Sequence, residues 1–196
     1  MALKKSGQLF ICLFLLFPFF LGCKDNSTVK NPVSPEMVTE APKITCDTFD
    51  IITDLKGSLL TVSVKTDLPP ETQLIIVIER IYHEKDNDKS QGVEYFNDKS
   101  TVGTYEHPQS IPVDNEVWFN KLKAHVQRMT LENKGSYYDS IDNYIQVRIA
   151  VPTSQESPKF GKQNENLVGL EVIEDKYNDK YIRKEVTLVY PMDLKK

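Results

Sequence analysis

Three histidines and one cysteine are the residues whose side chains could most readily act in catalysis or bind a metal. His83, His107 and His125 stand far apart in the sequence and form no ligand pair such as His-x-x-x-His. Cys46 has no neighbouring pattern that would activate its thiol, so we expect a buried, inert thiol there. The sequence also lacks a Gly-x-Ser-x-Gly motif and a Gly-rich phosphate loop. It therefore predicts no catalytic residue, no metal site and no cofactor, and leaves open a site assembled from distant residues.

A run of polar residues from Asp86 to Gly92 places oxygen-bearing side chains at alternate positions, as a calcium-binding loop does. The spacing then departs from that loop. Its sixth position holds Gln91 where glycine is needed, and its twelfth holds Asn97 where a bidentate carboxylate is needed. The expected structure is a solvated hairpin tip.

Aromatic side chains are the candidates for contact with a partner. Tyr137 and Tyr138 fall together in a polar connection, and Phe160 lies within the long polar loop Thr153 to Asn166. Exposed aromatic residues suit recognition because they offer rigid contact area, although tyrosine is also an ordinary strand residue. Phe160 has two possible arrangements: packed onto the domain, where it pins the loop, or projecting outward as an apolar anchor. We expect Tyr137, Tyr138 and Phe160 to belong to one contact surface.

Alternating apolar residues predict a domain built mainly of β-strands. Leu60, Val62 and Val64 alternate with polar residues, and Tyr144 to Val151 repeats this pattern. Leu74 to Tyr82 begins with a continuous apolar run, which is typical of a central strand buried on both faces. Further strands are expected at Thr48 to Thr53, Val93 to Phe96, Thr101 to Tyr105, Leu167 to Ile173 and Ile182 to Tyr190.

One segment, residues 114–134, changes to a helical period. Trp118, Leu122, Val126 and Met129 share one helical face, and Asp114 stands where an N-cap would accept amide hydrogen bonds. A strand is the alternative, because Leu122, Ala124 and Val126 also alternate with polar residues, but the capping residue favours the helix. Short antiparallel strands with one inserted helix predict a β-sandwich over residues 43–196, immunoglobulin-like by architecture.

The N-terminal residues form an export signal. Lys4 and Lys5 precede an apolar run from Leu9 to Leu21, which is shorter than the roughly 20 residues a membrane span needs. The closing sequence Phe-Leu-Gly-Cys, ending at Cys23, resembles the lipobox of bacterial lipoproteins. This resemblance covers only the first 23 residues, and Phe20 and Leu21 depart from its commonest form. It implies that residues 1–22 are removed and that Cys23 is acylated.

The resemblance also implies attachment to the cell membrane or, because Lys24 rather than aspartate follows the cysteine, to the outer membrane if the cell has one. The proline-rich residues 23–42 then form a flexible linker that reaches about 25 Å. A formal net charge of −4 without a basic cluster argues against nucleic-acid binding. We expect a membrane-anchored, non-enzymatic domain that contacts a protein or glycan of the cell envelope. The alternative is a hydrolase or ligand-binding lipoprotein whose site forms only in the fold.

Overall fold

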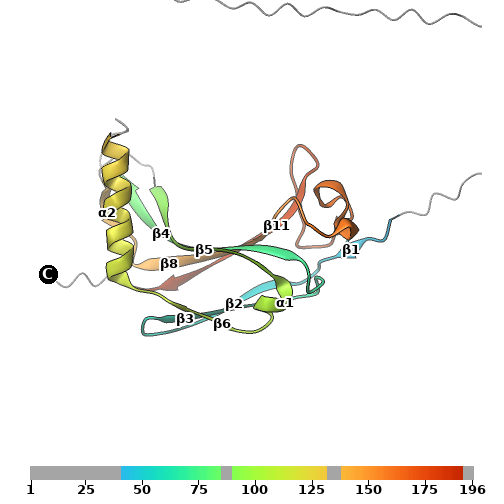
Figure 1. Ribbon diagram of the computed structural model, residues 1–196, viewed down its shortest axis with the longest axis horizontal. Helices are drawn as coiled ribbons and strands as arrows, with labels where there is room; N and C mark the ends of the chain where they lie inside the picture. Colours follow the sequence, from blue (N-terminus) through green and yellow to red (C-terminus); the bar gives the residue numbers. More distant parts are fainter. Residues whose placement is uncertain (1–40, 85–89, 132–137, 192–196) are drawn as a thin grey trace, which may run out of the picture. The chain divides into compact units, whose positions relative to one another are not determined.

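The computed structural model describes residues 41–84, 90–131 and 138–191 (Figure 1). The chain is mainly β, with several antiparallel sheets. The larger sheet has the strand order β10-β11-β8-β4-β5. Its strands are β4 (Gln73–Glu84), β5 (Ser90–Thr101), β8 (Tyr144–Val151), β10 (Ile173–Glu174) and β11 (Lys180–Val189).

Strand β4 is the centre of this sheet, as its continuous apolar sequence predicts. It pairs with β5 along one edge and with two segments along the other, β8 near its start and β7 (Tyr138–Ile141) near its end. Both segments run antiparallel to β4, so β7 and β8 follow one line that is interrupted at residues 142–143. Ile76 and Ile78 are fully buried, which confirms the expected central strand.

The smaller sheet has the order β2-β3-β6 and lies below the larger sheet in Figure 1. It contains β2 (Phe49–Lys56), β3 (Leu59–Thr66) and β6 (Gln109–Pro112). Leu60, Val62 and Val64 are buried, as their alternation predicts. Side chains of both sheets form one hydrophobic core, in which Phe49 and Leu60 of the smaller sheet join residues such as Ile149 of the larger. The core thus joins strands that are distant in the sequence.

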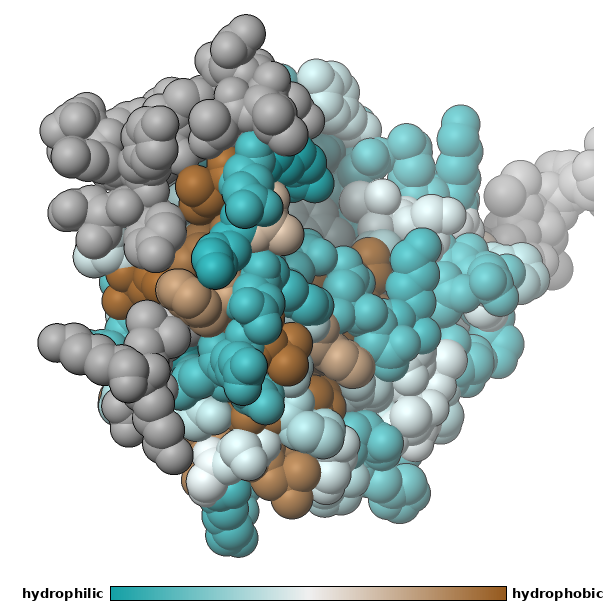
Figure 2. Space-filling model, turned by 60° about the vertical axis from the view of Figure 1, so that its left-hand side comes forward, coloured by the Kyte–Doolittle hydropathy of each residue, from teal (hydrophilic) through white to brown (hydrophobic). Residues whose placement is uncertain are grey.

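Helix α2 (Asn115–Leu131) confirms the helical prediction for this segment. The Asp114 carboxylate accepts the backbone N–H of Glu116 at 2.7 Å and that of Val117 at 3.4 Å, as an N-cap should. Trp118 and Leu122 are buried against the sheet, and the Trp118 indole donates to the Val93 carbonyl of β5 at 3.2 Å. Figure 2 brings this end of the molecule forward and shows hydrophilic residues running between hydrophobic ones.

Two strand predictions are wrong. The predicted strand from Thr101 to Tyr105 is not formed: Thr101 is the last residue of β5, which is longer than the predicted strand 93–96. Val102–Tyr105 forms a single helical turn, α1, whose first and last residues are buried. The predicted strand from Leu167 is broken at Gly169, which has φ +127° and lies so close to Cys46 that a side chain would collide with its backbone. Two short strands take the place of the predicted one, β9 (Leu167–Val168) and β10. Strand β9 pairs in parallel with β1 (Ile44–Thr45).

Candidate functional site

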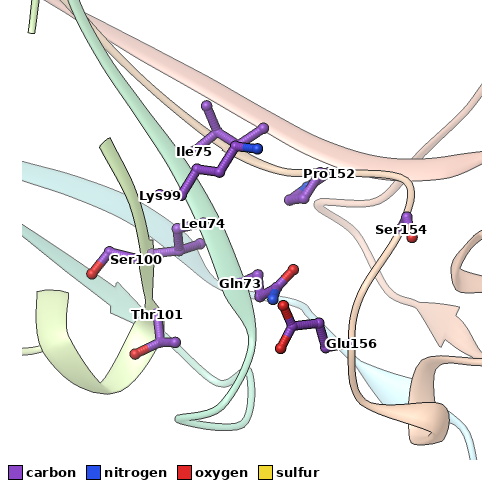
Figure 3. Close-up of a pocket in the computed structure, with 9 residues that line it drawn as sticks. All are labelled: Gln73, Leu74, Ile75, Lys99, Ser100, Thr101, Pro152, Ser154 and Glu156. Atoms are coloured by element: carbon purple, nitrogen blue, oxygen red, sulfur yellow. The ribbon is translucent and has the colours of Figure 1, made fainter. Parts of the chain in front are cut away.

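A hollow of about 420 Å³ lies where β4 begins, β5 ends and the chain leaves β8 (Figure 3). We call it the loop hollow. Its wall on one side is the start of the long loop, 153–166, that the sequence singles out. The residues that line it are Gln73, Leu74, Ile75, Lys99, Ser100, Thr101, Pro152, Ser154 and Glu156.

Pro152 and Gln155 together shape this wall. Ile75 stands opposite Ala150 in the sheet, so the same register carried two residues further places Gln73 opposite Pro152. Proline has no N–H to donate to the ladder. The side-chain amide of Gln155 replaces it: its oxygen accepts the Gln73 N–H at 2.7 Å, and its nitrogen donates to the Gln73 carbonyl at 3.2 Å. The loop is thereby fixed to the edge of β4.

The polar groups of the hollow come from both of its walls. Ser154 and Glu156 flank Gln155 and line the hollow, while Lys99 stands directly opposite Ile75 on the neighbouring strand. Figure 3 shows Lys99 beside Ile75, and Glu156 next to Gln73. Lys99 and Glu156 are both exposed. The hollow thus offers an ammonium group and a carboxylate to a ligand, with hydroxyl groups nearby.

The second half of the long loop is packed against the domain. Phe160 is fully buried, so the structure shows the packed arrangement and not the outward-projecting one. Asn164 is also buried and donates from its amide nitrogen to the carbonyls of Pro152 at 2.7 Å and Lys180 at 2.8 Å. These bonds hold Asn164 at φ 58°, an uncommon backbone conformation for a residue other than glycine. The Phe160 ring therefore supports the loop from inside and does not itself form a contact surface.

Tyr138 and the long loop that carries Phe160 do not share one end of the domain. Tyr138 begins β7 and stands opposite Glu84, the last residue of β4, whereas the long loop is fixed to Gln73, the first residue of β4. Twelve residues of strand, about 40 Å, separate the two positions. Tyr137 and Cys23 lie outside the described residues. Tyr138 and the long loop therefore lie at opposite ends of β4.

The histidines do not assemble a shared pocket either. The Nε2 atom of His83 contacts the Asp142 carboxylate at 2.8 Å, and the Nε2 atom of His125 contacts the Tyr82 hydroxyl at 2.8 Å. Because Tyr82 and His83 are adjacent in β4, their side chains point to opposite faces of the sheet. His107 is exposed after α1. Within the described ranges, no group of three His, Cys, Asp or Glu residues could hold a metal ion.

A serine, a histidine and an aspartate do meet near the end of β4. Ser140 stands opposite His83 across the β4–β7 pair, and Asp142 follows two residues later. In a hydrolytic triad the aspartate holds one ring nitrogen and the serine the other. Here Asp142 contacts Nε2 of His83, while among the described side chains no hydrogen bond joins the His83 ring to the Ser140 hydroxyl. This grouping has the residue types of a nucleophilic site without its geometry, and sequence spacing alone could not have revealed it.

Cys46 is buried and free, as expected for an inert thiol. Burial is the main cause that raises its pKa to about 12, against a smaller opposing effect of the hydrogen bond with Thr66. Such a thiol is protonated at neutral pH and is a poor nucleophile. Cys46 therefore belongs to the core and not to a site.

No helix in the described part of the chain is both long and apolar enough to cross a membrane. Comparison with known proteins gives no matching family, no similar curated protein and no similar solved structure.

Proposed function

We propose that this chain is a lipid-anchored, non-enzymatic binding protein of the bacterial cell envelope, and that it captures a polar peptide segment in the loop hollow. The observation that carries the proposal is the opposed pair Lys99, on β5, and Glu156, on the loop that Gln155 fixes to β4. A volume of about 420 Å³ lies within the range of small-ligand sites. The Ig-like β-sandwich belongs to this proposal, supported by the two sheets that share one core.

The chemistry of the loop hollow favours a peptide over a sugar. Lys99 would pair with a carboxylate of the ligand and Glu156 with an ammonium group, each as a charge-assisted hydrogen bond. Ser100, Thr101 and Ser154 add hydroxyl groups that both donate and accept. None of the nine lining residues is aromatic, so the hollow offers no flat ring on which a sugar could stack.

The anchor rests on the N-terminal sequence. Lys4, Lys5, the short apolar run and the lipobox-like ending at Cys23 support acylation of that cysteine and export. Two or three acyl chains hold a protein far more firmly than one. Cys23→Ser should leave an unprocessed or soluble protein that incorporates no labelled palmitate. Palmitate that still enters this variant would show that the anchor is elsewhere.

The ligand site is tested separately from the anchor. Short peptides with free ends would be titrated against the full-length protein while amide shifts are followed by NMR. Lys99→Gln and Glu156→Gln should each weaken binding about tenfold, since each removes one charge-assisted hydrogen bond. Lys65→Gln, on an exposed position of β3, is the matched control and should leave binding unchanged. Equal affinity in all four proteins would reject the loop hollow as the site.

A hydrolase is the second candidate, supported by the grouping of Ser140, His83 and Asp142. It would require Ser140 to approach a nitrogen of His83 when substrate binds. A chromogenic ester offered to the purified protein tests this directly. Turnover that disappears in both Ser140→Ala and His83→Gln would favour the hydrolase over the binding protein.

A further inference from the structure

We infer that a second hollow, between α2 and β5, binds an oxyanion, that is, the carboxylate or phosphate group of a ligand. This helix groove encloses about 520 Å³. The groove is distinct from the loop hollow, because the two share no lining residue. Helix α2 itself lies at the opposite end of the described domain from β1 (Figure 1). Its lining residues are Gly92, Val93, Glu94, Lys121, Ala124, His125 and Arg128.

The helix supplies the positive charge of the groove. Lys121, His125 and Arg128 follow one another at spacings of four and three, which places them on one face of α2. In the described ranges neither Lys121 nor Arg128 forms an ion pair with a carboxylate. Lys121 donates instead to the Tyr95 carbonyl at 2.7 Å and lies 5.3 Å from the centre of that ring. One N–H of its ammonium group is used, and two are left for a ligand.

Arg128 is positioned by a neutral partner. Its Nη2 atom lies 3.1 Å from Nδ1 of His125, and because a guanidinium group only donates, this nitrogen must accept. The Nε2–H of the same ring then donates to the Tyr82 hydroxyl, 2.8 Å away, and Tyr82 is buried. His125 thus orients Arg128 without cancelling its charge. A guanidinium fork held in this way is suited to two parallel hydrogen bonds with an oxyanion.

The groove carries a positive charge although the whole chain is negatively charged. Lys121 and Arg128 are opposed by Glu94, which accepts a hydrogen bond from Asn97 at 3.1 Å. The lining therefore carries an excess of one positive charge with His125 neutral, while the full chain has a formal net charge of −4. A cationic hollow on an acidic protein concentrates anions there and not over the remaining surface.

The test is a titration of the full-length protein with inorganic phosphate and, separately, with succinate, at low and at physiological ionic strength. Arg128→Gln and Lys121→Gln should each weaken binding about tenfold, because each removes a charge-assisted hydrogen bond. Lys123→Gln is the control: it lies on the same helix, is exposed and does not line the groove. The comparison of phosphate with succinate shows which oxyanion the groove prefers.

A variant that is expected to strengthen binding separates the loss of an anion site from the loss of folded protein. Glu94→Gln removes the one acidic side chain of the lining and should strengthen binding severalfold. Saturable binding that is weakened by Arg128→Gln, strengthened by Glu94→Gln and unchanged in Lys123→Gln supports the inference. The inference is overturned if neither anion binds saturably, or if Lys123→Gln weakens binding as much as Arg128→Gln does.

Discussion

The guanidinium carbon of Arg80 lies 4.7 Å from the centre of the Trp118 ring, so a charge from the central strand is stacked against the helix that covers it. Arg80 is only 2% exposed. It donates to the carbonyls of Asp142 at 2.9 Å and Tyr190 at 2.8 Å, and to the Asn115 side chain at 3.0 Å. Burial lowers its pKa, while the charges of Tyr190 and Asp142 act in the opposite direction. One side chain therefore joins β4, the interruption between β7 and β8, the start of α2 and the end of β11.

Replacing this arginine should be costly. Arg80→Met fills part of the same space but leaves three acceptors without their donor, and we expect the free energy of unfolding to fall by about 2–4 kcal/mol. Urea unfolding of residues 43–196, followed by Trp118 fluorescence, measures the loss. Arg183→Met is the control, because Arg183 is exposed and its ion pair among the described residues is with exposed Glu185. It should change stability by less than about 0.5 kcal/mol. A similar small change in both variants would contradict a structural role for Arg80.

A buried ion pair on the other face of β4 gives the second prediction. Arg148 reaches both oxygens of Glu79, at 2.8 and 3.4 Å, and the Glu79 side chain is 8% exposed. The carboxylate lies so close to Gly92 on β5 that a Cβ there would come within 2.5 Å of it. Arg148→Met should cost about 3 kcal/mol, because it leaves a buried carboxylate without its cation.

The double variant separates the ion pair from the packing. Glu79→Gln combined with Arg148→Met removes both charges at once and should recover most of the loss. Chemical unfolding of the four proteins in this cycle supplies the coupling energy. Additive losses would mean that the two charges do not depend on each other.

Asp67 makes the stability of the fold depend on pH. Burial acts to raise its pKa, but the backbone N–H groups of Asp47 and Thr48, at 3.0 and 3.3 Å, more than offset this, so the pKa lies below its ordinary value of 3.8. Because the folded pKa is the lower one, the ionised form stabilises the fold. This contribution is complete above the ordinary value and is lost as the pH falls through the folded pKa.

Asp67→Asn should therefore lower stability at neutral pH and reduce the further loss of stability in acid. The measurement is the free energy of unfolding from pH 7 down to the acid transition. Asp50→Asn, at an exposed position of β2, is the control and should follow the wild-type curve. Parallel curves for wild type and Asp67→Asn would contradict the assignment.

Cys46 should be protected from thiol reagents in the folded domain. It is fully buried and its pKa is raised to about 12, so both access and ionisation oppose reaction. It is the one thiol of residues 43–196, because the other two cysteines, Cys12 and Cys23, precede that range. Maleimide labelling at pH 7 should be negligible under native conditions and complete in denaturant. Rapid native labelling would show that the β1–β9 end opens.

Regular elements could be predicted from the sequence where local pattern and burial agree. In β8, Ile145, Val147, Ile149 and Val151 are all fully buried, as their alternation requires. Helix and strand patterns competed in residues 114–134, and the Asp114 cap favoured the helix correctly because it satisfies backbone donors that only a helix leaves free.

The failures arise where contacts distant in sequence decide the backbone. Gly169 breaks the predicted strand because Cys46, more than a hundred residues away, lies against it. The length of the loop 153–166 marks it in the sequence, but the role of Gln155 could not be predicted. A single side-chain amide that replaces a missing backbone N–H leaves no repeating pattern in the sequence. The sequence allows Phe160 to pack inside the domain or to project outward, and only the packed fold distinguishes the two.

The pairing of β1 with β9 has a mechanical consequence. The backbone N–H groups of Ile44 and Cys46 donate to the carbonyls of Asn166 and Val168 at 2.8 and 2.7 Å, and β1 is only two residues long. Tension applied through the N-terminal segment would load this short pair before it reached the eight-residue hairpin strands β2 and β3. The domain should therefore yield in two stages, with a weak release of β1 that uncovers Cys46, followed by a stronger resistance from the core.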